Sequence, residues 1–580
     1  MRNILKTSTR RQFCGAIAAA PFAHAAAPGR RQPNVIVLLT DDQGYGDLAC
    51  HGNPVVHSPN FDRLHSESVR FTNFHVDPLC SPTRSALMTG RYSCRTGVWS
   101  TVYGRELLRR DEVTMADVFA ANGYRTAIRG KWHLGDNYPY RPQDRGFQDV
   151  LIHGGGGVGQ TPDYWGNSYF NDTYFRNGKP EKFEGYCTDV WVRDGVRFIE
   201  RNRDHPFFLY LPTNAAHAPL NVDPKYAKPY LDAGVPEDVA KFYGMVTNID
   251  ENVGYLRASL KRLGLEKDTL FVYMGDNGSA AGARPRAGEA QYHPFNAGMR
   301  GQKGSPYDGG HRVTCFMHWP GAGIQGGRDL PQLAAHIDLL PTFIDLLGLK
   351  RPAGPEFDGV ALGPVLKGGG AIKPRSIAVQ TQQRDTPQKW ARSAMLDARW
   401  RLVEGKELYD IVADPGQTKD VAPGHHDVVS RLRGDYEKWW SSVSQRFGEY
   451  SEIVLGSERE NPSRLNCMDW HCEKIMPWNQ PMVEKNQVGN GFWAVRAERA
   501  GRYEFTLRER PVEAKGIMQS RQARIRIGKA DEHKPIPQGA AAVSFMLMLP
   551  AGSARLETWL EGWPDGASRG AYFVDVRFLG

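Results

Sequence analysis

Acidic and amide side chains follow two apolar runs of the chain. Asp41 and Asp42 come directly after the run 34–40, and Asp276 and Asn277 follow the run 269–274 after one glycine. Three carboxylates and an amide carbonyl form an all-oxygen donor set. Such a set suits Ca²⁺ or Mg²⁺, whereas Zn²⁺ is expected to bring His or Cys ligands. Because Asp-Asp and Asp-Asn-Gly are also common turn sequences, two ordinary turns are the alternative interpretation.

A second group of residues surrounds Cys80. Ser81 followed by Pro82 is typical of a helix start, with Ser81 as N-cap and Pro82 at the first helical position. Cys80 then lies just before a helix N-terminus, where free amides and the helix dipole favour an anion. Arg84 and Arg91 are seven residues apart, on one face of the expected helix, and Arg84 is near enough to its start to reach the same anion. The pattern indicates either a reactive or modified Cys80 or a half-buried cysteine before an ordinary capped helix.

Several motifs of this chain resemble those of sulfatases. Residues 80–84 and 89–91 match the family's Cys-x-Pro-Ser/Thr-Arg and Thr-Gly-Arg signature. Residues 130–133 resemble its Lys-x-His segment, residues 216–219 resemble the segment with its substrate-side histidine, and Lys303 matches its second lysine. The resemblance extends from about residue 33 to residue 422. In chain order, the matching site residues are Asp41, Asp42, Cys80, Arg84, Lys131, His133, His217, Asp276, Asn277 and Lys303.

The resemblance implies a chemical modification and a metal. In sulfatases the signature cysteine is converted to formylglycine by a formylglycine-generating enzyme, so Cys80 is expected to carry that group. One divalent cation, Ca²⁺ in preference to Mg²⁺, is expected on Asp41, Asp42, Asp276 and Asn277. One hydroxyl of the hydrated aldehyde would attack sulfur, and loss of the proton from the second hydroxyl would release sulfate. An ordinary serine lacks that second hydroxyl.

The resemblance also implies roles for the basic residues. A sulfate ester is already negative, so its oxygens must be neutralised by fixed positive charge. The expected roles are charge neutralisation by Arg84, Lys131 and Lys303, protonation of the leaving alcohol by His217 or Lys303, and proton removal from the second hydroxyl by His133.

Two other functions compete with a sulfatase. A phosphoesterase or phosphonate monoester hydrolase of the same alkaline-phosphatase superfamily shares the metal end of the site, and some members share the modified cysteine. A non-catalytic glycan-binding protein on this scaffold would keep Cys80 unmodified. Lys131, His133, His217 and Lys303 together favour a sulfate ester. Because the chain carries 14 Trp and shows an export signal, we expect a carbohydrate sulfate before an aryl sulfate.

The elements that must position these residues follow from the apolar runs. The runs 34–40, 206–211, 269–274 and 313–317 read as strands buried on both faces, and helical patterns cover 190–199, 236–263 and 333–347. Strands alternating with helices predict an α/β fold, in which functional groups collect at the carboxyl ends of the strands. By resemblance this is an alkaline-phosphatase-like sulfatase core, with a mixed central sheet flanked by helices.

The rest of the chain divides into three further segments. Residues 1–25 place paired arginines before an Ala-rich stretch and small residues, the order of a twin-arginine signal peptide. The catalytic domain is expected over 33–374 and a small α+β subdomain over 375–450. Alternating strand patterns with regular turns predict a β-sandwich over 451–580. We therefore expect a periplasmic or secreted protein without a membrane anchor.

Charge and cysteine content limit the partners. The formal charge is +9, with 73 basic and 64 acidic residues, and four of the basic residues lie in the signal segment. Without those four, 69 basic residues face 64 acidic ones, a net charge of +5 that gives little support for nucleic-acid binding. The expected partner is a sulfated small molecule or glycan. Seven cysteines remain after the signal, so one lies outside any disulfide scheme.

Overall fold

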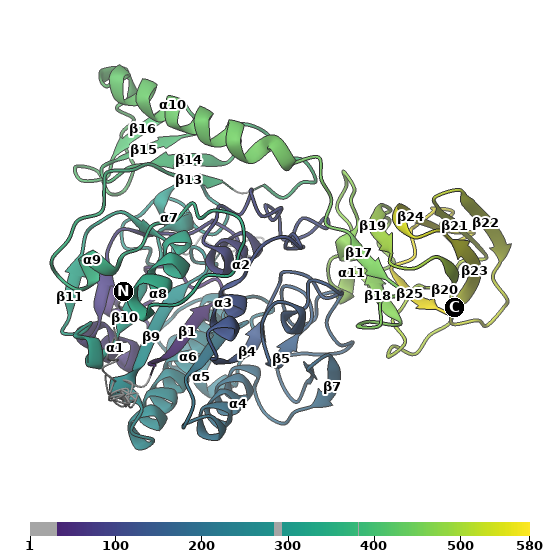
Figure 1. Cartoon of the computed structure of the whole chain (residues 1–580), viewed down its shortest axis with the longest axis horizontal. Coiled ribbons are helices and arrows are strands. Elements are labelled where there is room, and N and C mark those ends of the chain that lie inside the picture. Colours follow the sequence, from purple (N-terminus) through teal and green to yellow (C-terminus); the bar gives the residue numbers. More distant parts are fainter. Residues whose placement is uncertain (1–31, 283–292, 381) are drawn as a thin grey trace, which may run out of the picture. The chain divides into compact units, whose positions relative to one another are not determined.

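A ten-stranded mixed sheet is the largest sheet among the described residues (Figure 1). The structure is a computed structural model that describes residues 32–282, 293–380 and 382–580. The strand order of this sheet is β11-β2-β10-β9-β1-β8-β4-β5-β6-β7, and the inner strands from β9 to β5 are parallel. The strands are β1 (Asn34–Thr40), β2 (Val69–Phe71), β4 (Arg125–Lys131), β5 (Asp149–His153), β6 (Thr173–Arg176), β7 (Lys179–Lys182), β8 (Phe207–Pro212), β9 (Thr269–Gly275), β10 (Cys315–His318) and β11 (Arg328–Leu330).

Both faces of this sheet are buried by helices. Along β1, Ile36 and Leu38 belong to one apolar core, and Val35, Val37 and Leu39 belong to the other, which explains why the run is apolar throughout. The first core takes in α1 (Pro59–Glu67), α4 (Cys187–Arg201), α5 (Pro224–Asp232) and α6 (Glu237–Arg262), and the second takes in α2 (Cys80–Thr89), α3 (Met115–Ala121), α8 (Leu339–Leu347) and α9 (Gly363–Leu366). The predicted α/β class with a mixed sheet flanked by helices is confirmed.

One expected helix is shorter than its sequence pattern. The pattern covers 333–347, but α8 begins at Leu339. Ala334 and Ala335 instead form β12 (Ala334–Ala335) and pair with β3 (Phe74–His75). Pairing with a distant strand thus outweighs the local helical periodicity here.

The chain after residue 374 forms three smaller antiparallel or mixed sheets. The first is β13 (Ile377–Gln380), β14 (Ser393–Leu396), β15 (Trp400–Val403) and β16 (Glu407–Asp410), and α10 (His426–Val443) shares its core. The other two share one apolar interior and form the expected sandwich. One of these sheets contains, in order, β17 (Ile453–Leu455), β19 (Phe492–Ala497), β24 (Gly552–Glu561), β21 (Gln522–Ile527) and β22 (Ala530–Pro535). The other contains, in order, β18 (Ser463–Asn466), β25 (Phe573–Phe578), β20 (Gly501–Arg508) and β23 (Val543–Leu549).

The sandwich interior extends into the N-terminal half of the chain. Tyr103, Leu107 and Tyr140 belong to the same apolar core as the sandwich strands, and the Tyr103 amide donates to the Met468 carbonyl at 3.1 Å. Residues Pro33–Gly580 form one compact unit. The boundaries at 374 and 450 stay predictions, and the signal segment 1–25 lies outside the described residues. Among the described helices, none has the length and apolar character needed to cross a bilayer.

Candidate active site

The acidic residues meet at the carboxyl ends of two paired strands. Strands β1 and β9 are parallel neighbours with Thr40 opposite Gly275, so the residues that follow them emerge side by side. The Asp42 amide donates to Asp276 Oδ1 at 3.0 Å. Carboxylate oxygens of Asp41, Asp42 and Asp276 and the sulfur of Cys80 all lie within 4.8 Å of one another. The structure therefore brings together the carboxylates that the sequence places after separate strands.

Three cations balance these carboxylates, one for each. Lys131 Nζ lies 2.6 Å from Asp41 Oδ2, Arg84 Nη2 lies 2.8 Å from Asp276 Oδ2, and Lys303 Nζ lies 2.6 Å from Asp42 Oδ1. Burial is the strongest influence on Asp41 and would raise its pKa, but the charges of Lys131, His217 and Arg84 together hold that pKa below its usual range. Burial and the neighbouring Asp41 raise the pKa of Asp276.

Cys80 lies against this cluster at the start of α2. Its side chain is buried, with Sγ 3.4 Å from Asp41 Oδ1 and 4.0 Å from Asp42 Oδ1. Burial and the charge of Asp41 raise the pKa of the thiol. The predicted N-cap is wrong: α2 begins at Cys80 itself, with Leu79 as the cap. Pro82 thus falls in the third helical position. An N–H group there would have no carbonyl partner within the helix, so the proline costs no backbone hydrogen bond.

Arg91 does not belong to the site. The helix α2 ends at Thr89, and Gly90 takes a left-handed conformation that turns the chain away. The Arg91 guanidinium lies 3.2 Å from Glu112 Oε2 and donates to the Glu356 carbonyl. The expectation that Arg84 and Arg91 share one helical face is therefore wrong, because the helix is too short to hold both.

The two predicted histidines reach the site from loops. His133 has a φ of +60°, so it does not continue the strand β4, which ends at Lys131. Its Nε2 lies 3.1 Å from the Thr101 carbonyl. His217 Nε2 lies 3.9 Å from Asp42 Oδ2. Burial and nearby lysines lower the pKa of both imidazoles.

The donor set fits a hard divalent cation. Asn277 lies beside the three carboxylates: its Nδ2 donates to Asp42 Oδ1 at 3.1 Å and to Asp276 Oδ1, and its Oδ1 is buried without a hydrogen-bond partner among the described residues. Oxygen donors of this kind, packed closely and buried, match the ligand preference of Ca²⁺ and Mg²⁺. Asp41, Asp42, Asp276 and Asn277 would hold the ion.

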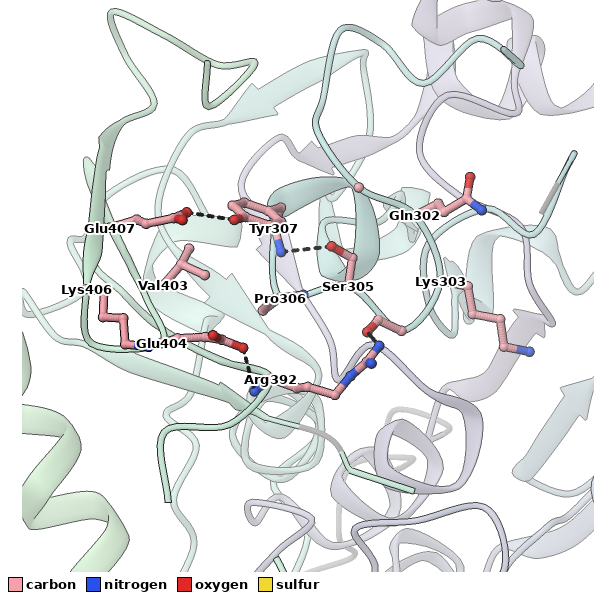
Figure 2. A pocket seen from close by; sticks show the side chains of 12 residues that line it. Gln302, Lys303, Ser305, Pro306, Tyr307, Arg392, Val403, Glu404, Lys406 and Glu407 are labelled. Carbon is pink, nitrogen blue, oxygen red and sulfur yellow. Dashed lines mark hydrogen bonds between the residues drawn. The ribbon is translucent and has the colours of Figure 1, made fainter. Parts of the chain in front are cut away.

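A cavity of about 750 Å³ opens beside Cys80. The predicted residues His133, His217 and Lys303 line it together with Cys80. Lys303 also borders a second cavity of about 460 Å³ on the other side of its loop, and Figure 2 shows its side chain pointing away from Glu404, Lys406 and Glu407 there.

Two segments of the site were not found from sequence. The first is the glycine run 154–157: a Cβ on Gly156 would lie 2.1 Å from the His133 ring, so only glycine fits there. Four consecutive glycines were a visible signal for such a close approach. The second is the segment 475–484, which lines the cavity from the sandwich side. It carries no motif, and its proximity depends on long-range packing alone.

Comparisons with known proteins agree with this geometry. The sulfatase family model matches residues 33–349. N-acetylgalactosamine-6-sulfatase from Homo sapiens is 31% identical over 508 residues, which cover 78% of this chain and 91% of that protein. Arylsulfatase A from Homo sapiens is 31% identical over 377 residues, covering 60% of this chain and 70% of that protein.

A solved structure gives the same answer for the fold. The crystal structure of Ps i-CgsB in complex with k-i-k-neocarrahexaose has a TM-score of 0.64 and 28% sequence identity, and covers 73% of this chain and 95% of that one. The family model spans more than half of this chain, and the described site gathers the residues that carry the resemblance. The chain therefore belongs to the sulfatase family and is a sulfuric ester hydrolase.

Proposed function

We propose that this protein is an exported, formylglycine-dependent sulfatase that removes sulfate from a carbohydrate. The observation that carries the proposal is the position of Cys80. Its sulfur lies 3.4 Å from a carboxylate of the acidic cluster and borders a cavity that Lys303 and His217 also line. Export rests on the signal pattern of residues 1–25, whose basic, apolar and small residues follow the order of a twin-arginine signal.

We propose that Cys80 is converted to formylglycine by a formylglycine-generating enzyme. The hydrated aldehyde supplies two hydroxyls, one to accept the sulfuryl group and one whose deprotonation re-forms the aldehyde and releases sulfate. The buried thiol has a raised pKa, so an unmodified Cys80 would be a poor nucleophile at neutral pH. This supports a modified residue rather than a reactive thiolate.

The chain's own residues would perform the remaining tasks. Arg84 and Lys131 lie buried behind Cys80 and fix the orientation of Asp276 and Asp41, so their positive charge is preorganised rather than recruited from solvent. Lys303 is partly exposed to the cavity, where it can contact the sulfate oxygens. His217 and Lys303 are the candidates to protonate the leaving alcohol, and His133 is the candidate base for the second hydroxyl.

A bound divalent cation, Ca²⁺ in preference to Mg²⁺, would polarise the sulfate oxygens. Asp41, Asp42, Asp276 and Asn277 are its proposed ligands. The three cations that already pair with the carboxylates keep the whole site close to neutral, so that an anionic substrate is not repelled.

A carbohydrate sulfate is favoured as substrate. N-acetylgalactosamine-6-sulfatase acts on a sugar sulfate by its name, and the Ps i-CgsB structure holds a neocarrahexaose. A cavity of about 750 Å³ lies within the range that encloses a drug-sized ligand, more than a sulfate group needs. The walls therefore have surface left for the sugar.

The test combines chemistry at residue 80 with turnover. Mass spectrometry of the peptide containing residue 80 should find formylglycine in active protein, and an unmodified thiol in fully active protein would refute the mechanism. A screen over defined sulfated sugars, with a chromogenic aryl sulfate and the matching aryl phosphate, should give the highest kcat/KM on a sugar sulfate. Preferred turnover of the phosphate would instead identify the phosphoesterase, and binding of glycan without turnover would identify a non-catalytic glycan-binding protein.

A further inference from the structure

The cavity beside Cys80 has two chemically different walls. The wall near the acidic cluster is charged and comes from the α/β core. The outer wall includes Tyr103, Ile475, Met476 and Trp478, which are apolar or aromatic, and it comes largely from the segment 475–484. This segment lies more than 390 residues after Cys80 in the sequence. A residue of the C-terminal region therefore faces the same space as the reacting group.

Trp478 is held in place from both sides along the chain. Its carbonyl accepts from the Thr161 amide at 3.1 Å, and the preceding Pro477 carbonyl accepts from Thr161 Oγ1 at 2.8 Å. On the other side, Asn479 pairs with Gln160 as an isolated β-bridge. The backbone that carries Trp478 is thus fastened to the loop that forms the neighbouring part of the wall.

Gln480 strengthens this attachment. Its side-chain amide is buried and donates to the carbonyls of Gln160, Asp163 and Tyr164 at 3.2–3.3 Å, while its oxygen accepts from the Gly166 amide at 3.0 Å. All of the hydrogen-bonding groups of the amide group therefore point into one loop. A site on so fixed a backbone loses little conformational entropy when a ligand binds.

The indole itself is half-buried and divided between two surroundings. It packs against the apolar core of the sandwich, and it also lines the cavity. None of the hydrogen bonds found among the described residues uses its Nε1 atom. Part of the ring is therefore supported by the core, and part is open to whatever occupies the cavity.

We propose that Trp478 is a specificity-determining residue that stacks on a sugar ring of the substrate. The C–H face of a pyranose is apolar and weakly positive, and it complements the electron-rich face of an indole. Tyr103 and the exposed Ile475 add apolar surface to the same wall, while the exposed Glu484 at one end of the segment offers a carboxylate to sugar hydroxyls. This inference rests on the proposed carbohydrate-sulfatase function and adds Trp478 as the residue that recognises the sugar ring.

The experiment compares Trp478→Ala and Trp478→Phe with a matched control, Trp559→Ala. Trp559 is also half-buried, but it lies on β24 between Arg524 and Arg526 and does not line the cavity. For each protein, kcat/KM is measured on the preferred sulfated sugar and on 4-nitrophenyl sulfate. The inhibition constant of the desulfated sugar is measured against 4-nitrophenyl sulfate, and thermal unfolding checks the fold.

We expect Trp478→Ala to lower kcat/KM on the sugar sulfate about tenfold or more and to weaken inhibition by the desulfated sugar by a similar factor. Turnover of 4-nitrophenyl sulfate should stay within about twofold, because the reacting residues are untouched. Trp478→Phe should recover most of the loss, and Trp559→Ala should behave as the parent protein.

Equal losses on both substrates would assign Trp478 a structural role and overturn the inference. An unchanged Trp478→Ala enzyme on a good sugar substrate would overturn it as well, while leaving the carbohydrate-sulfatase function intact. A parent protein that turns over aryl sulfates but no sugar sulfate would remove the proposed substrate class, and this inference with it.

Discussion

Two buried acidic clusters in this protein are stabilised in opposite ways. At the candidate active site, burial would raise the pKa of Asp41, but the positive charges around it, led by Lys131, hold that pKa below its usual range. In the other cluster, Glu106 is 1% exposed and Asp469 is 4% exposed. Burial and the neighbouring Asp469 raise the pKa of Glu106 well above its usual range, and burial raises the pKa of Asp469 to about 7. One cluster is neutralised by fixed cations and the other by a proton.

The difference shows that buried acidity alone does not make a cation site. No N–H or hydroxyl donor of the described residues reaches the oxygens of Glu106, and its group with Asp469 does not bring three candidate ligand atoms together. The cluster at Cys80 combines closely spaced oxygens, a free amide oxygen and counter-charges. Those counter-charges hold the pKa of Asp41 below its usual range, which favours the ionised form that a metal ligand needs. The Glu106–Asp469 pair has instead the properties of a structural contact between the core and the C-terminal region.

The largest effect is expected at Cys80. Cys80→Ala should lower kcat by at least about 1,000-fold, since no nucleophile remains. Cys80→Ser should transfer at most one sulfuryl group, because the sulfated serine has no second hydroxyl to release sulfate. Intact-protein mass spectrometry after incubation with substrate should detect that ester. Sustained turnover by either variant would contradict the proposed role of formylglycine.

The next effect separates the two acidic clusters. Asp276→Asn removes a carboxylate from the candidate metal site and the partner of Arg84, so we expect activity to fall about 100- to 1,000-fold. Glu106→Gln keeps the shape of the other cluster and should stay within about twofold of the parent rate. Steady-state kinetics after chelation and graded return of Ca²⁺ measure both. A similar loss of activity in the two variants would contradict the difference between a cation site at Cys80 and a structural contact at Glu106.

Lys303 and Lys406 make a smaller but well-matched comparison. Lys303 borders both cavities and pairs with Asp42, whereas Lys406 lines only the second cavity (Figure 2). Lys303→Ala should lower kcat/KM about 100-fold through loss of positive charge at the sulfate. Lys406→Ala should change it less than about twofold. An unchanged rate for Lys303→Ala would refute the role assigned to this lysine.

The smallest effect concerns stability and pH. Because Asp469 has a higher pKa folded than unfolded, the folded state binds its proton more tightly, and stability falls as pH rises from about 4 to about 7. Glu106→Gln removes a carboxyl group whose own pKa is raised well above its usual range, and should therefore reduce the pH dependence of stability by about 1–2 kcal/mol. Thermal unfolding between pH 5 and pH 8 should therefore show a flatter profile for the variant. Parallel profiles would mean that the pair does not share a proton.

Much of the site could be predicted because it depends on local rules. Parallel strands end at one edge of a sheet, so the residues after β1 and β9 had to meet, and the motif around Cys80 predicted that this residue belongs to the same site. The predictions that proved wrong concern segments whose conformation depends on contacts with neighbouring elements. The helical pattern 333–347 overestimates the helix because Ala334 and Ala335 pair with β3 instead. The helix α2 ends before Arg91 because Gly90 terminates it. The wall around Trp478 and the Glu106–Asp469 pair join segments hundreds of residues apart, and no local pattern encodes such contacts.

The sandwich and part of the N-terminal half share one apolar core, so the position of each depends on the other. The Thr101 carbonyl that contacts His133 lies two residues before Tyr103, which is buried in the sandwich interior and bonded to Met468. The sandwich thus supports the loop 101–103, and we expect a substitution in its interior to displace the Thr101 carbonyl from His133.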